Sequence, residues 1–315
     1  MSLASQEDPH TSKRGLRYVI RALASSDIPP LVGLMQLRPS IDTVPCLFSW
    51  MEADPQGMKV AITDTGEIAG TCSFVMNGDR DEDGIYFGGV FFVQEKFRSQ
   101  GIGQQLRNAC LKHIGDRNAA ANAVPGKLDS FKSGGLPIQE DRFTTLEYHT
   151  ISWPRDFSSF PDIPPPGVEI CNFEECHLPK IYVYDEKIVG FSRQKNMRLN
   201  ILERGSRTLV AIGAGGSLVG FGTVKKTVLD EVRIGPLYAD SPDVAEVLLR
   251  RLSAVPEHGS GFTLVTTSAN SAARGWMRRL GVNVREECDR LYRKRKLDAD
   301  LGKVFAMLDV NFSPF

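Results

Sequence analysis

The sequence predicts an α/β (α+β) protein made of two similar domains in tandem, and three observations support this. The chain has 315 residues, which exceeds one compact domain of the usual size, roughly 100–200 residues, and suits two. Two segments match each other at an offset of 150 residues. Short β-type runs also alternate with amphipathic helical runs in both halves.

The match between the halves centres on two hairpin patterns. Val60-Ala61-Ile62 aligns with Val210-Ala211-Ile212, and Gly66 aligns with Gly216. In each copy a β-type run, a glycine-marked turn and a second apolar run follow one another, which is typical of a β-hairpin. Each domain is therefore expected to contain a β-meander, and the matching order and spacing indicate an internal duplication.

The elements of the first half are predicted from caps and apolar periodicity. Ser25-Ser26-Asp27 is an N-cap pattern before an apolar-periodic stretch. Ile85–Val93 is a continuous apolar run typical of a buried strand, whereas the apolar residues of Gln104–Ile114 share one helical face. The predicted elements are a helix over 28–35, a hairpin over 59–75, strands over 85–93 and 143–152, and a helix over 104–114.

Proline marks the boundary between the copies. Residues 153–167 are rich in proline, which disfavours both helix and central strand, so this stretch is predicted to be the linker. The expected organisation is a polar N-terminal tail (1–14), a first domain (15–152), the linker (153–167) and a second domain (168–315).

A glycine-containing turn lies between the predicted strand 85–93 and the helix that follows it. The first N–H groups of a helix have no partner inside the helix, and the helix dipole adds positive potential there. Gly101 and Gly103 let an anion approach the main chain closely, and Arg98 adds a positive charge. The turn is therefore a candidate phosphate site. It has neither the Lys-Ser/Thr of a nucleotide P-loop nor the three glycines of a dinucleotide fold.

The segment Phe92–Leu106 resembles motif A of the GNAT acetyltransferases. The resemblance extends over the first half of the chain and implies two GNAT folds, each a mixed, mostly antiparallel twisted sheet flanked by helices. It also implies acetyl-CoA, or another acyl-CoA, as the co-substrate. The implied pyrophosphate-binding residues are Arg98, Ser99, Gln100, Gly101, Ile102 and Gly103, and the implied pantetheine-pairing residues are Phe91, Phe92 and Val93.

The catalytic residues of the family are not matched. Phe131 stands where many family members have a tyrosine acid, and the strand position of a catalytic glutamate is apolar, near Phe87. Transfer to an amine needs a base or a water chain and donors for the oxyanion. The candidate bases are Glu82, Asp83, Tyr148 and His149. The alternative for each is a solvated turn charge or a strand residue with satisfied hydrogen bonds.

The second copy lacks the glycine turn. Its strand-to-helix junction carries Asp240 and Asp243 where a pyrophosphate would lie, and Met277 stands where tyrosine is often found. Residues 184–193 together with residues 234–240 resemble the C-terminal domain of a subgroup of tandem GNAT acetyltransferases, which implies a degenerate domain that shapes the acceptor side. Asp185, Arg193 and Tyr238 are the candidate acceptor-side residues, with ordinary ion pairs as the alternative.

Composition excludes several classes of partner. Lys plus Arg and Asp plus Glu number 38 each, so no net charge favours nucleic acid or an anionic membrane. The basic run 290–296 is interpreted as a strand end with solvated cations. No apolar run approaches the roughly 20 residues of a spanning helix, and a cytoplasmic protein is expected. The six cysteines are scattered and are expected to be mostly buried thiols, with no metal.

The sequence thus predicts an acyl-CoA-dependent N-acyltransferase that acts on a small amine or amino acid by direct transfer. Two alternatives remain open. The protein could be a non-catalytic acyl-CoA-binding or regulatory protein, or it could acetylate peptides or proteins. The oligomeric state and the identity of the acceptor are not predicted.

Overall fold

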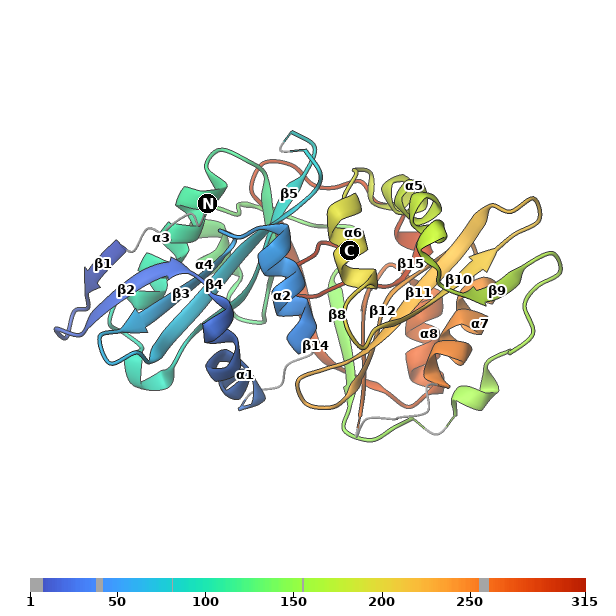
Figure 1. Ribbon diagram of the computed structural model, residues 1–315, viewed down its shortest axis with the longest axis horizontal. Coiled ribbons are helices and arrows are strands. Elements are labelled where there is room, and N and C mark those ends of the chain that lie inside the picture. The colour runs from blue at the N-terminus through green and yellow to red at the C-terminus, as the bar shows by residue number, and fades with distance from the viewer. Residues whose placement is uncertain (1–7, 38–41, 81, 155, 255–260) are drawn as a thin grey trace.

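The computed structural model describes residues 8–37, 42–80, 82–154, 156–254 and 261–315. Its strands and helices form two units that lie side by side (Figure 1). The first half contains β1 (Asp8–Thr11), β2 (Arg17–Ala22), α1 (Ile28–Gln36), α2 (Val44–Ala53), β3 (Met58–Thr63), β4 (Ile68–Asn77), β5 (Ile85–Val93), α3 (Ile102–Ile114), β6 (Ala119–Ala123), α4 (Leu128–Ser133), β7 (Ile138–Gln139) and β8 (Thr145–Thr150).

The second half repeats the pattern of strands and helices. It contains β9 (Glu169–Asn172), α5 (Leu178–Val189), α6 (Gln194–Ile201), β10 (Arg207–Ile212), β11 (Leu218–Lys226), β12 (Val232–Ala239), α7 (Pro242–Ser253), β13 (Phe262–Thr267), α8 (Ser271–Arg279), β14 (Asn283–Tyr292) and β15 (Val304–Ala306). The predicted strand 85–93, both hairpins and the helix after the glycine turn are confirmed. Helix α2 and strand β1 were not predicted.

One mixed sheet runs through the whole molecule in the order β1-β2-β3-β4-β5-β6-β14-β8-β13-β12-β11-β10-β9. The pairs β5–β6 and β12–β13 are parallel, and the other pairs are antiparallel. The fold class, two mixed and mostly antiparallel α/β units in tandem, is therefore as predicted.

The two units exchange strands at their junction. Strand β6 of the first half pairs with β14 of the second half, and β13 of the second half pairs with β8 of the first half. Strands β8 and β14 also pair with each other. The chain before the predicted boundary at residues 153–167 and the chain after it therefore contribute alternate strands to the middle of the sheet.

Three apolar clusters fill the layers on the two faces of the sheet. One joins α3 to strands of the first unit, with Leu106 and Cys110 fully buried. Another joins α7 and α8 to the second unit, and it includes Phe157 and Phe160 from the proline-rich segment. The third is shared, because it contains Trp50 and Phe87 of the first half together with residues of α5 and α6. Within the described residues, no helix is long and apolar enough to cross a membrane.

Candidate functional site

The turn between β5 and α3 has the geometry of an anion site. Ser99 (φ 61°) and Gly101 (φ 88°) adopt left-handed conformations, and α3 begins at Ile102 with no side-chain cap. Among the residues that the structure describes, no hydrogen bond engages the main-chain N–H groups of residues 99–104. A Cβ on Gly101 would have no heavy atom within 4 Å. These N–H groups are therefore available to phosphate oxygens.

The side chain of Gln100 stabilises the turn through hydrogen bonds to Ser12 and Lys96. Its Oε1 accepts a hydrogen bond from Ser12 Oγ (2.9 Å), and its Nε2 donates to the Lys96 carbonyl (3.2 Å). Its own carbonyl accepts from Lys13 N (3.2 Å). Residues just after β1, which the sequence placed in a polar tail, thus fix the turn. Arg98 remains exposed beside it and donates to the Val93 carbonyl.

Strand β5 separates from β6 half-way along its length. The parallel pairing covers Tyr86↔Ala119 to Gly88↔Ala121 and then stops. Beyond this point β5 is bulged at Val90 (φ 44°), and its register with β4 shifts between Thr71 and Ser73. We call the resulting gap between β5 and β6 the first slot. A bulge bends its strand and ends the pairing on one side, which explains why the slot opens here.

Two hydroxyl groups of β4 hold the bulge. Thr71 Oγ1 donates to the Val90 carbonyl (2.7 Å), and Ser73 Oγ donates to the Gly89 carbonyl (2.7 Å). Sequence reasoning missed both residues. Two hydroxyl residues two positions apart in an otherwise apolar part of the strand were the available indication.

Phe91, Phe92 and Val93 lie on β5 beyond the point of separation. Phe92 and Val93 pair with β4. The side chain of Phe91 is 51% exposed and would lie 3.3 Å from a Cβ added to Gly103. The three strand residues and the turn residues therefore follow one another along one edge of the first slot. A ligand with a pyrophosphate and an extended arm would need this arrangement.

The structure does not bring the four candidate bases to this slot. Glu82 and Asp83 are exposed in the turn before β5. Four residues of β5 (85–88) lie between this turn and Gly89, which corresponds to roughly 13 Å of strand. Tyr148 is buried in the core of the second unit, and burial raises the pKa of its phenol. His149 Nε2 lies 2.8 Å from Glu231 Oε1, also within the second unit.

Asp185, Arg193 and Tyr238 are brought together, but they are buried. Arg193 uses its five N–H groups on Asp185 (two bonds of 2.8 Å), Tyr238 (3.0 Å), Ser313 (2.7 Å) and the Phe315 carbonyl (3.1 Å). Burial alone would lower the pKa of Arg193, but the charge and hydrogen bonds of Asp185 and Tyr238 together raise that pKa. The arrangement leaves Arg193 no N–H group for an acceptor.

The second unit has an equivalent separation of its parallel strands, which we call the second slot. Strands β12 and β13 pair from Val232↔Phe262 to Ile234↔Leu264. Strand β15 then pairs with β12, and Met307 N donates to the Val265 carbonyl of β13 (2.8 Å). Residues 304–307 therefore lie where the second slot would open. The adjoining helix α7 is capped by Ser241, whose side chain accepts from Val244 N.

One group of possible metal ligands is present in the described part of the chain. Oxygen or sulfur atoms of Asp42, Cys46 and Asp309 lie within 4.8 Å of one another, and all three residues are buried. The Arg233 guanidinium donates to Asp309 (3.1 Å), and Asn311 Nδ2 donates to both Asp42 oxygens. Arg233 thus supplies a cation beside these carboxylates. The six cysteines are free thiols, and burial raises the pKa of Cys46 well above its usual range.

Family models match both halves of the chain. Residues 31–124 match the acetyltransferase (GNAT) family, and residues 181–306 match an acetyltransferase (GNAT) domain. The first match contains β5, the turn and the start of α3, and the second contains the whole of the second slot. The chain belongs to the GNAT acetyltransferase family. It is a tandem GNAT protein, because each half carries one GNAT domain. No curated protein sequence matches the chain.

Solved structures share the fold over nearly the full length. A proposed acetyltransferase from Pyrococcus horikoshii is 19% identical, with a TM-score of 0.70 over 94% of this chain and 96% of that one. A tandem GNAT protein from the clavulanic acid biosynthesis pathway is 17% identical, with a TM-score of 0.63 over 88% and 98%. A GCN5-related N-acetyltransferase from Sphaerobacter thermophilus is 16% identical, with a TM-score of 0.58 over 95% and 100%. At these identities the similarity shows the fold alone.

Proposed function

We propose that the protein is an N-acyltransferase that transfers an acyl group, in the first place acetyl, from CoA to a small amine or amino acid. The observation that carries this proposal is the row of unengaged N–H groups at residues 99–104 beside the first slot. In the GNAT family such a site holds acyl-CoA. The turn would bind the pyrophosphate, and the free edge of β5 from Phe91 to Val93 would pair with the pantetheine arm.

Transfer in this slot needs only positioning and main-chain donors. The thioester would lie near the bulge, where an N–H group of Phe92 or Val93 can stabilise the oxyanion that forms as the amine attacks. The amine must arrive neutral, so its proton passes to water. Because Phe131 stands where the family often has a tyrosine, we infer that the CoA thiolate is also protonated by water.

We infer that the second domain binds no acyl-CoA. Three observations support this. Residues 304–307 occupy the second slot. The Ser241 side chain already caps the helix that follows β12. Asp240 and Asp243 place negative charge at that helix start, where it would repel a pyrophosphate.

The proposal is tested by calorimetric titration of acetyl-CoA into the wild type and into Gly101→Asp. We expect micromolar binding by the wild type and at least tenfold weaker binding by the variant, because the carboxylate would lie among the N–H groups that hold the pyrophosphate. Gly215→Asp is the matched control. Gly215 also has a left-handed φ (83°) and open space around its Cβ, but it lies in the β10–β11 turn of the second unit. Wild-type protein that binds no acetyl-CoA would refute the proposal.

A non-catalytic acyl-CoA-binding protein is the second candidate, because the usual tyrosine is missing from both copies. Thioester turnover separates the two. Release of free CoA that depends on an added amine supports the enzyme. Tight acetyl-CoA binding without turnover on a broad panel of amines and amino acids supports the binding protein.

A further inference from the structure

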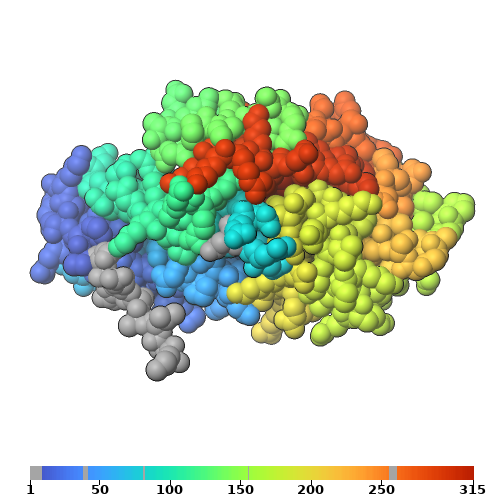
Figure 2. Space-filling view, turned by 90° about the horizontal axis from the view of Figure 1, so that it is seen from above, coloured from blue at the N-terminus to red at the C-terminus, as the bar shows by residue number. Residues whose placement is uncertain are grey.

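Residues 307–315 form a buried segment that runs from the second slot to the first; we call it the crossing segment. It begins at Met307, which is bonded to β13, and Phe312, Ser313 and Phe315 are fully buried. The exposed residues that precede the crossing segment, red in Figure 2, form a band across the junction of the two units. The family match to the second unit ends at residue 306, just before this segment.

The crossing segment packs directly on the first slot. A Cβ added to Gly89, at the bulge of β5, would lie 2.0 Å from the Asn311 carbonyl oxygen. Asn122 is the first β6 residue beyond the parallel pairing, and its Nδ2 donates to the Val310 carbonyl (3.0 Å). Main chain of the crossing segment thus lies against both edges of the slot at the point where they separate.

The crossing segment covers the face of the sheet opposite α3. Helix α3 packs with Tyr86 in one apolar cluster, whereas Phe87 packs with Phe312 and Phe315 in another. Because neighbouring strand residues point to opposite faces, the two clusters lie on opposite sides of β5. An acyl-CoA bound at the start of α3 leaves this second face for the acceptor.

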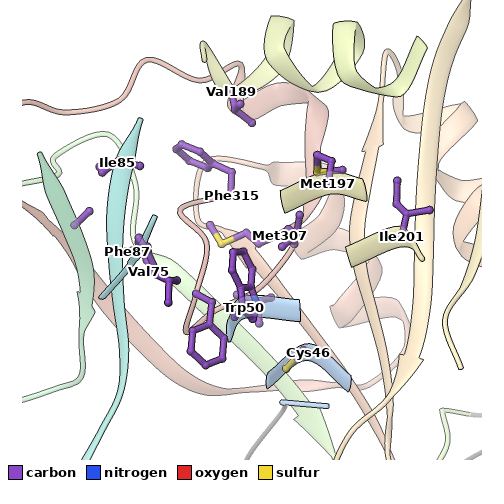
Figure 3. Packing of buried hydrophobic residues seen from close by; sticks show 14 of the residues in the cluster. Cys46, Trp50, Val75, Ile85, Phe87, Val189, Met197, Ile201, Met307 and Phe315 are labelled. Carbon is purple, nitrogen blue, oxygen red and sulfur yellow. The ribbon is translucent and has the colours of Figure 1, made fainter. Parts of the chain in front are cut away.

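Many contacts hold the crossing segment in place. Asn77 Nδ2 donates to the Phe312 carbonyl (2.7 Å), and Arg290 Nη1 donates to the Pro314 carbonyl (2.8 Å). Arg193 donates to Ser313 and to the Phe315 carbonyl. Figure 3 shows Phe315 and Met307 between Phe87 of β5 and Met197 of α6. Release of the segment would break all these bonds and expose several aromatic rings, so it acts as a fixed surface and not as a lid.

We propose that residues 309–312 of the crossing segment are the specificity-determining wall on the acceptor side of the first slot, and that they admit small amines and exclude peptides. This inference rests on the proposed function. An attacking nitrogen must come within roughly 3–3.5 Å of the thioester carbon. Main chain at Asn311 already occupies the space over Gly89, so only a compact amine fits beside it. A peptide would need the extended groove that this segment fills.

Phe312 offers the test, and Phe305 is its matched control. The Phe312 ring stacks on Trp50 (centroids 5.6 Å apart), and Asn77 of β4 binds its carbonyl. The Phe305 ring stacks on Trp276 (5.0 Å) in the core of the second unit. Both rings are nearly fully buried and come from the same stretch of chain. Phe312→Ala removes bulk from the wall, whereas Phe305→Ala removes the same ring at a distance from the first slot.

The experiment compares two bisubstrate probes by calorimetry. In one, CoA is joined through an acetyl linker to propylamine; in the other, it is joined through the same linker to the α-amino group of a tripeptide. We expect the wild type and Phe305→Ala to bind the propylamine probe at least tenfold more tightly than the tripeptide probe. In Phe312→Ala the ratio should fall at least fivefold, with unchanged affinity for CoA itself.

The outcomes separate the two proposals. Equal binding of both probes by a wild type that binds CoA would overturn the wall and leave the proposed function intact. The same ratio in folded Phe312→Ala as in Phe305→Ala would also overturn it. A wild type that binds neither CoA nor the probes would refute the proposed function and, with it, the wall.

Discussion

At the residue scale, the informative side chains are charged groups that the fold has buried. Arg193 and Arg290 are at most 1% exposed, and each binds main-chain carbonyls of the crossing segment. Arg290 belongs to the basic run that was interpreted as a strand end with solvated cations, and for this residue the interpretation was wrong. Its guanidinium lies over the ring of Phe87 (4.7 Å to the centroid). Both arginines therefore fix the segment that covers the first slot.

The Arg193–Asp185 pair permits a stability prediction. Asp185→Asn should lower the free energy of unfolding by about 3–5 kcal/mol, because it leaves a buried guanidinium without its counter-charge. Asp162→Asn, which removes the exposed partner of Arg251, should cost less than about 1 kcal/mol. Urea unfolding followed by circular dichroism measures both. Similar losses in the two variants would show that burial of the pair does not matter.

At the element scale, the bulge of β5 connects the sheet to the candidate site. A regular β5 could stay paired with β6 beyond Gly88, because β6 continues to Ala123. Instead, two carbonyls of β5 turn towards hydroxyls of β4, and the strand leaves β6 at Gly88. The slot is therefore a consequence of local strand geometry.

The double variant Thr71→Val/Ser73→Ala tests this link. Each change leaves a carbonyl of the bulge without its donor and should lower the free energy of unfolding by about 1–3 kcal/mol. Because the bulge opens the slot, we also expect acetyl-CoA to bind at least threefold more weakly in calorimetry.

Thr208→Val serves as the control for the bulge. It removes the buried hydrogen bond between the hydroxyl groups of Thr208 and Thr223 in the β10–β11 hairpin of the second unit. It should destabilise the protein without a change in acetyl-CoA affinity. If the bulge variant kept wild-type affinity while losing stability, the bulge would have no role in shaping the slot.

At the scale of the whole molecule, the strand exchange joins the two units in one sheet, so we expect them to unfold as one cooperative structure. Strand β8 completes the sheet of the second unit, and β14 pairs with the end of the first. The shared apolar cluster adds contacts between the halves. Neither half has its full sheet without the other.

Single-tryptophan variants can report on this cooperativity. Trp50 lies in α2 of the first unit and Trp276 in α8 of the second. Each variant keeps one of these tryptophans and carries phenylalanine at the other tryptophan positions. In each variant, the normalised fluorescence transition in denaturant should coincide with the transition followed by circular dichroism. Two separate transitions would instead indicate that the units unfold independently.

The sequence alone determined the two-domain α/β class, the hairpins, the β5 strand and the glycine turn. These features depend on neighbouring residues, because apolar periodicity, caps and glycines act over a few positions. The residues of the acyl-CoA site proposed for the first domain were predictable for the same reason, since they are contiguous in the chain.

Only the tertiary structure decided the exchange of β8 and β14, the filling of the second slot and the course of the crossing segment over Gly89. It also decided that Arg193, held in place by Asp185 and Tyr238, anchors the crossing segment. Strand partners distant in sequence leave no local pattern, and whether a charged side chain is solvated or buried depends on what packs over it. The proposed acceptor side of the first slot is built from such long-range contacts, so the sequence predicted the glycine turn far better than the surface opposite it.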